Sequence, residues 1–147
     1  MDRTAVKKLD RLCSTYVRLR DKLTCRKCGR RFEMWRDAKG EIKISPGYHW
    51  AHIFSRVHRS IRWDDANGIG LCMGCHRWMD REHWDRWEWL KTIGYTDEQF
   101  DLLRHRSQQK FSGDWKLIEM YLRQGIDKLV GGRNGSNGVE YKRRKLS

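Results

Sequence analysis

Four of the five cysteines in this chain form two C-x-x-C pairs, Cys25 with Cys28 and Cys72 with Cys75. Thiolates three residues apart in a tight turn can bind one ion together, and two such pairs complete the tetrahedral sulfur site that zinc favours. A thioredoxin-like redox motif needs only one pair, in a βαβ setting that this sequence lacks. We therefore expect a structural zinc ion at these four cysteines.

The two pairs are unusually far apart, because 43 residues separate Cys28 from Cys72. An ordinary zinc finger or ribbon has about 15 to 20 residues in this interval. Closing so long a loop costs chain entropy, which metal binding would offset. The metal would then hold in place both the inserted strand that carries His52 and the helix that starts at His76.

The order of residues around these pairs resembles the zinc-stapled branch of the HNH, or ββα-metal, endonucleases. That family has an acidic residue or histidine followed by histidine on one strand, an asparagine in the next loop, and C-x-x-C-H at a helix start. The matching residues here are Ala51-His52-Ile53, Asn67 and Cys72-Met73-Gly74-Cys75-His76. The resemblance covers residues 25–80. It implies an α+β fold with a ββα-metal core and a four-cysteine zinc site, flanked by N-terminal and C-terminal helices.

A narrower resemblance, to the phage NinG/Rap recombination family, rests on spaced residues over most of the chain. They are Leu9 to Arg20, Cys25 to Gly29, Tyr48 to His52, Ile61 to Asp64, Asn67, and Trp89-Leu90 before Gly94. This resemblance implies metal-dependent cleavage of branched DNA or recombination intermediates such as Holliday junctions, leaving 3′-hydroxyl and 5′-phosphate ends. It also implies a phage-infected bacterial host, and a homodimer would place two sites on two strands.

Phosphodiester hydrolysis needs a base for water, a cation to neutralise charge, and rigid positioning of both. The resemblance assigns the general base to His52, whose imidazole titrates near working pH. Asn67 would orient this base or brace the loop. His76 would hold a catalytic Mg²⁺ or Mn²⁺ ion; the alternative is a histidine that packs on the zinc knuckle.

One residue departs from the family pattern, because Ala51 stands where the family carries a metal ligand. His49 is the first substitute, since it lies on the same strand face as Ala51 but about 7 Å away. Asp80 and His83 follow His76 by four and seven residues on the next helix and are further candidates. The missing ligand leaves a second function open, a non-catalytic zinc-dependent DNA-binding protein that keeps the HNH fold.

Basic residues indicate the partner. Lys and Arg number 32 against 19 Asp and Glu, so the formal net charge is +13, which indicates a polyanion such as DNA. Arg56, Arg59 and Arg62 recur at every third position and could together contact phosphates; the alternative is a solvated charged loop. The sequence has neither a transmembrane run nor an apolar signal region, so we expect a cytoplasmic protein.

The elements that must position these residues can be read from hydrophobic periodicity and turn signals. We expect one domain over residues 1–130 and a flexible basic tail over 131–147. The expected helices cover residues 5–23, with a basic outer face and a buried Cys13, then 76–92, a short helix opened by a capping box at Thr96, and 114–130, weakened by Gly125. The expected strands cover 48–54 and 69–72, with a hairpin or loop at 36–47 and a polar loop at 55–68.

The helix predicted over residues 76–92 carries four tryptophans, too many for one apolar stripe. They are Trp78, Trp84, Trp87 and Trp89. We expect two of them in the core and the others stacked on a partner, either a second subunit or an unpaired base.

Overall fold

The computed structural model describes residues 2–131, and their fold is mixed α+β. In chain order the elements are α1 (Arg3–Arg20), β1 (Met34–Arg36), β2 (Ile42–Ile44), β3 (Tyr48–His52), α2 (Arg59–Arg62), the 3-10 turn η1 (Asp65–Asn67), β4 (Gly68–Cys72), α3 (Met73–Arg81), α4 (Asp85–Thr92), α5 (Asp97–Ser107) and α6 (Trp115–Gly131). None of the helices in this part of the chain is long and apolar enough to span a membrane. The predicted tail lies outside the described residues except for Gly131.

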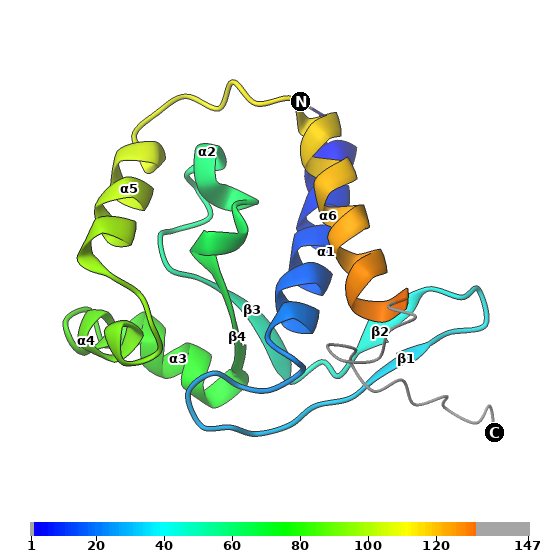
Figure 1. Ribbon diagram of the computed structural model, residues 1–147, viewed down its shortest axis with the longest axis horizontal. Coiled ribbons are helices and arrows are strands. Elements are labelled where there is room, and N and C mark those ends of the chain that lie inside the picture. The colour runs from blue at the N-terminus through cyan, green and yellow to red at the C-terminus, as the bar shows by residue number, and fades with distance from the viewer. Residues whose placement is uncertain (1, 132–147) are drawn as a thin grey trace.

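Strands β3 and β4 form an antiparallel pair at the centre of the molecule (Figure 1). Their register runs from Tyr48 opposite Cys72 to His52 opposite Gly68. Helix α3 begins at Met73, directly after β4 and three residues before the predicted start at His76. The other predicted hairpin is also present, because β1 pairs with β2.

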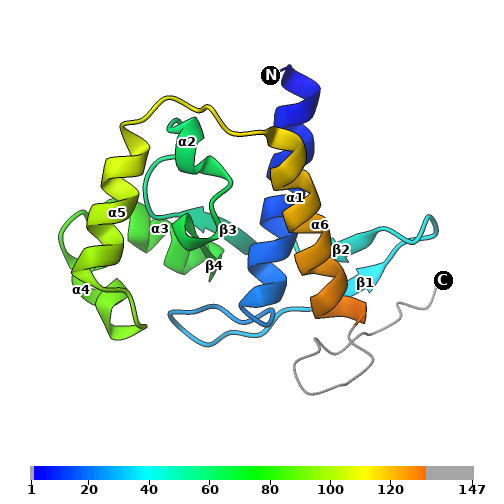
Figure 2. The ribbon, with the colours of Figure 1, turned by 45° about the horizontal axis from the view of Figure 1, so that its top comes forward.

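The β3–β4 pair separates two hydrophobic clusters. One contains Tyr48 of β3 together with the apolar faces of α1 and α6, including Leu9 and Leu122. The other contains Ala51 of β3 with residues of α3, α4 and α5, such as Met79. Figures 1 and 2 both show α1 beside α6 on one side of the strand pair and α4 with α5 on the other. Successive side chains of β3 therefore enter different cores.

Two glycines of β4 allow the aromatic side chains of β3 to pack closely. A Cβ atom at Gly70 would lie 2.1 Å from the Tyr48 hydroxyl, and one at Gly68 would lie 2.6 Å from the Trp50 indole nitrogen. Neither position has room for a side chain. The Gly-Ile-Gly sequence is thus a packing requirement of this face of the strand pair.

The contact between α1 and α6 explains Gly125, which the sequence suggested only as a weak point of the helix. A Cβ atom at Gly125 would lie 2.3 Å from the ring of Tyr16 in α1. The glycine allows the two helices to approach, and Leu122 and Ile126 on either side of it are buried. Glycine lowers helix propensity, but at this position its small size permits the close contact between α1 and α6.

The prediction of a single helix over residues 76–92 was wrong, because α3 ends at Arg81 and α4 starts at Asp85. An unbroken helix would separate Trp78 and Trp89 by about 16 Å along its axis. The break instead brings their ring centroids to 5.7 Å in an edge-to-face contact. The predicted loop at 55–68 was also incomplete, since it contains α2 and η1.

Three of the four tryptophans in this region pack against other aromatic rings and one is exposed, whereas the sequence predicted two of each. Trp78 and Trp89 pack on each other, and Trp87 packs on Phe54 and Phe100. Trp84, in the turn between the helices, is 87% exposed.

Candidate functional site

The four paired cysteines converge on one point. Their sulfur atoms all lie within 4.8 Å of one another, and the Sγ atoms of Cys28 and Cys72 are 3.7 Å apart. Two thiolates on one tetrahedral zinc ion, each about 2.3 Å from it, would be about 3.8 Å apart. A disulfide would need about 2.05 Å, so the cysteines are free thiols in a geometry that could bind a metal such as zinc.

Backbone contacts hold the two cysteine pairs against each other. The amide of Cys25 donates to the Arg30 carbonyl and closes the first turn, and the next amide, of Arg26, donates to Gly70 in β4. The second pair is continuous with β4, and Cys72 is the N-cap of α3, its sulfur accepting from the Cys75 amide. The first knuckle therefore lies on the strand that leads directly into the second.

The fifth cysteine takes no part in this cluster. Cys13 lies in α1 and is fully buried, as the sequence predicted, and burial raises the pKa of its thiol.

A cavity of about 800 Å³ opens between α1, the end of β3, the loop that follows it, α3 and the start of α4. It is the place where predicted catalytic residues come together, because both His52 and His76 line it. Asp80 and His83, two of the suggested substitute ligands, line it as well. Segments far apart in the chain thus contribute imidazole and carboxylate groups to one space.

His52 is held as a neutral imidazole with a defined tautomer. Its Nε2 atom is 3.1 Å from the backbone carbonyl of Arg62, and a carbonyl only accepts, so Nε2 carries the hydrogen. Among the described residues no group donates to its Nδ1 atom, which is therefore the basic nitrogen. Burial lowers the pKa of His52 to about 4, and the hydrogen bond to Arg62 opposes this shift only in part.

His49 is not among the residues that line this cavity, but its ring contacts that of His76. Their Nδ1 atoms are 3.0 Å apart, the separation of two nitrogen ligands at right angles on an ion about 2.1 Å from each. The Asp80 carboxylate is 3.7 Å from the Nε2 atom of His76. Burial, and then the electrostatic influence of the neighbouring His76 ring, lower the pKa of His49, which favours its neutral, ligand-competent form. His49 and Asp80 therefore lie at opposite nitrogens of the His76 ring, so the two imidazoles could share an ion that the Asp80 carboxylate does not reach.

Asn67 is fully buried and braces a loop, the second of the two roles considered for it. Its side-chain oxygen accepts from the Phe54 amide, and its nitrogen donates to the carbonyls of Phe54 and Ile61. The adjoining carbonyl, of Arg62, is the one that orients His52. Asn67 is therefore linked to His52 indirectly, through α2 and through Ile53 and Phe54, the residues that follow His52.

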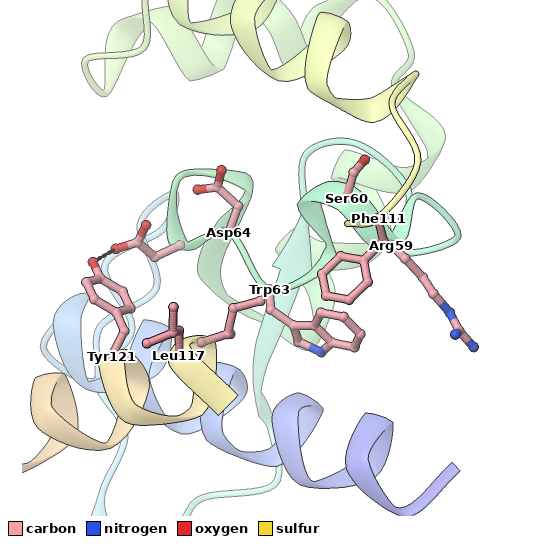
Figure 3. A pocket seen from close by; sticks show the side chains of 9 residues that line it. Arg59, Ser60, Trp63, Asp64, Phe111, Leu117 and Tyr121 are labelled. Carbon is pink, nitrogen blue, oxygen red and sulfur yellow. Dashed lines mark hydrogen bonds between the residues drawn. The ribbon is translucent and has the colours of Figure 1, made fainter. Parts of the chain in front are cut away.

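The three arginines predicted to bind phosphate together are not equivalent. Arg62 forms a bidentate ion pair with Asp10 of α1 at 2.9 and 2.6 Å, so its guanidinium already has an anion. Arg56 is exposed and lines the 800 Å³ cavity. Arg59 lines a separate hollow of about 340 Å³ between α2 and α6. Figure 3 shows its guanidinium pointing away from Tyr121 and Leu117 in that hollow. Arg56 and Arg62 thus line one cavity and Arg59 the other, and phosphate binding by the three together stays a prediction.

Two aspartates, the partly exposed Asp10 and the buried Asp21, make contacts that the sequence did not predict. Asp10 accepts from Arg62 and from the Trp63 indole, and so joins α1 to α2. Asp21, at the end of α1, accepts from the Gly70 amide and pairs with Arg20 and Arg26. The contacts with Arg62, Trp63 and Gly70 span 49 to 53 residues of the chain, so no local pattern marks them.

The predicted basic outer face of α1 is partly turned inward. Arg18 donates to the Tyr48 carbonyl, and Arg20 donates to the carbonyls of Asp65 and Gly68. These arginines hold the β3–β4 pair to the helix.

Comparison of the chain with protein-family models, with curated proteins and with solved structures gave no match.

Proposed function

We propose that this protein is a metal-dependent endonuclease that hydrolyses phosphodiester bonds in DNA, with an HNH-type ββα core. The observation that carries the proposal is the shared cavity: a neutral imidazole with a free basic nitrogen, His52, and a candidate metal ligand, His76, line the same space. Base and cation must reach one phosphate for hydrolysis.

In this proposal His52 removes a proton from the attacking water through Nδ1. Its opposite nitrogen stays fixed on the Arg62 carbonyl, so the ring does not rotate away. The ring also lies against Trp50, with centroids 4.1 Å apart. General bases of this kind contribute about 10²- to 10⁴-fold to a reaction rate.

His49 and His76 would hold the catalytic ion through their Nδ1 atoms, and Asp80, at the opposite nitrogen of His76, would orient that ring. Such an ion, when bound, neutralises charge that develops on the phosphate and the leaving oxygen. Two imidazole donors suit Mn²⁺ and later transition metals better than Mg²⁺, which prefers oxygen ligands. We therefore expect activity with Mn²⁺ to exceed activity with Mg²⁺.

Zinc on the four cysteines would have a structural role, holding β4 and the start of α3 in position. The net charge of +13 supports DNA as the substrate. The branched-DNA preference, the paired action of a homodimer and a phage-infected host come from the family resemblance alone, and the proposed cytoplasmic location comes from the hydropathy of the sequence.

The test is cleavage of labelled Holliday-junction and linear duplex DNA by zinc-loaded protein with added Mn²⁺ or Mg²⁺. We expect His52→Ala to cut at least a hundredfold more slowly than the wild type. His58→Ala is the matched control, since His58 is exposed and lines neither cavity. Equal cutting by the wild type and His52→Ala would refute the assigned base.

A second function is favoured by one observation, the fully buried Ala51, which has no ligand atom where the HNH pattern places one. Without a third ligand the chain would bind DNA through its basic surface and not cut it. Tight DNA binding with no cleavage at any divalent ion would support this function instead.

A further inference from the structure

The cavity of about 800 Å³ that His52 and His76 line also contains an arginine whose charge has no partner. Arg86 lies in the first turn of α4, and its Nε atom is buried without a hydrogen-bond partner. No carboxylate among residues 2–131 lies within ion-pair distance of its guanidinium. By contrast Arg62, in the same cavity, is fully paired with Asp10.

The rest of the surroundings of Arg86 do not compensate for this. The guanidinium lies over the ring of Trp87, 4.6 Å from its centroid, which fixes the group but supplies no acceptor atom. Burial lowers the pKa of Arg86, and the more distant charge of Asp80 opposes the shift without reversing it. A partly buried cation without an anion is costly, so such a group points to an anionic ligand.

The charge balance of the cavity agrees with an anionic ligand. Its walls carry Arg11, Arg56, Arg62 and Arg86 against Asp10 and Asp80. Once Arg62 and Asp10 neutralise each other, three arginines face one carboxylate. That carboxylate also lies beside His76.

Resting on the proposed function, we propose that Arg86 binds a phosphate of the DNA strand that enters the cavity. A planar guanidinium can donate two parallel hydrogen bonds to phosphate oxygens, which fixes the strand as well as attracting it. Arg86 thus takes the role that sequence spacing suggested for Arg59 and Arg62. It is a substrate-binding residue supplied by α4, outside the strands and helix that carry the histidines.

The experiment measures binding of fluorescently labelled junction DNA to zinc-loaded, full-length protein without added Mg²⁺ or Mn²⁺, over a range of salt concentrations. We expect Arg86→Gln to weaken binding about tenfold or more at low salt. It should also lower the slope of log affinity against log salt by about one, since one phosphate contact is lost. Arg86→Lys keeps the positive charge but loses the planar guanidinium, so its affinity should lie between that of the wild type and that of Arg86→Gln.

Arg81→Gln is the control, an exposed arginine of α3 that lines neither cavity, and it should leave affinity and slope unchanged. Thermal unfolding of each variant separates lost folding from lost binding. If the wild type binds and cuts DNA while Arg86→Gln and Arg86→Lys match it in affinity and salt slope, this inference fails and the proposed function stands. A wild type that binds no DNA would overturn both.

Discussion

His52 combines a buried ring with a fixed hydrogen bond, and its protonation therefore affects stability. Its pKa is lowered by burial from 6.5 to about 4 in the folded protein. As the pH falls below 6.5, the unfolded chain takes up the proton first, so folding stability decreases until about pH 4. We expect His52→Gln to show a shallower loss of unfolding free energy over this range, measured by urea denaturation at several pH values. If the unfolding free energies of the wild type and His52→Gln changed in parallel with pH, the lowered pKa of His52 would be contradicted.

Asn67 satisfies both sides of its amide inside the protein. Asn67→Ala leaves the Phe54 amide and carbonyl without their side-chain partner and removes one donor to the Ile61 carbonyl, so we expect a loss of about 2 to 4 kcal/mol in unfolding free energy. Because α2 would then shift the carbonyl that orients His52, cleavage should slow as well. Chemical denaturation measures the first effect. Gln109→Ala, an exposed amide substitution, should change stability by less than about 0.5 kcal/mol.

At the scale of elements, the contact of α6 with α1 depends on Gly125. We expect Gly125→Ala to destabilise the protein by about 1 to 3 kcal/mol, because its Cβ would overlap the Tyr16 ring. Gly74 in α3 has open space around its Cβ position, so Gly74→Ala should instead gain about 0.5 to 1 kcal/mol in helix propensity. Thermal unfolding of both variants tests the contrast. The same sign for both would show that the close approach does not limit packing.

The turn between α3 and α4 separates the exposed tryptophan from the packed ones. Trp87→Ala removes a ring packed against Phe54 and Phe100, and we expect a loss of about 3 to 5 kcal/mol. Trp84→Ala, at an 87% exposed position, should change stability by less than about 0.5 kcal/mol. Unfolding in denaturant measures both. A large loss at Trp84 would mean that its ring is covered in solution, for example by a second copy of the chain.

At the scale of the whole molecule, the cysteine cluster joins the segment after α1 to the β4–α3 junction. We expect one zinc ion per chain by elemental analysis. Cys28→Ser should abolish tight zinc binding and lower the unfolding temperature, and because Cys28 is exposed the loss would reflect the metal and not packing. Cys13→Ala, outside the cluster, should keep the zinc ion. Unchanged metal content in Cys28→Ser would exclude the four-cysteine site.

The amino-acid sequence by itself determined the features that depend on short spacings: the two cysteine pairs, the strands around His52 and Cys72, the capping box that starts α5, and the amphipathic helices at each end. Each of these features is determined by residues within one turn or one strand, so the sequence pattern predicts it. Only the tertiary structure decided which polar groups were already paired. Arg62 is neutralised by Asp10, 52 residues away, whereas Arg86 is not paired, and no local pattern distinguishes the two. Ion pairing and burial depend on which elements pack together, and packing is a property of the folded chain.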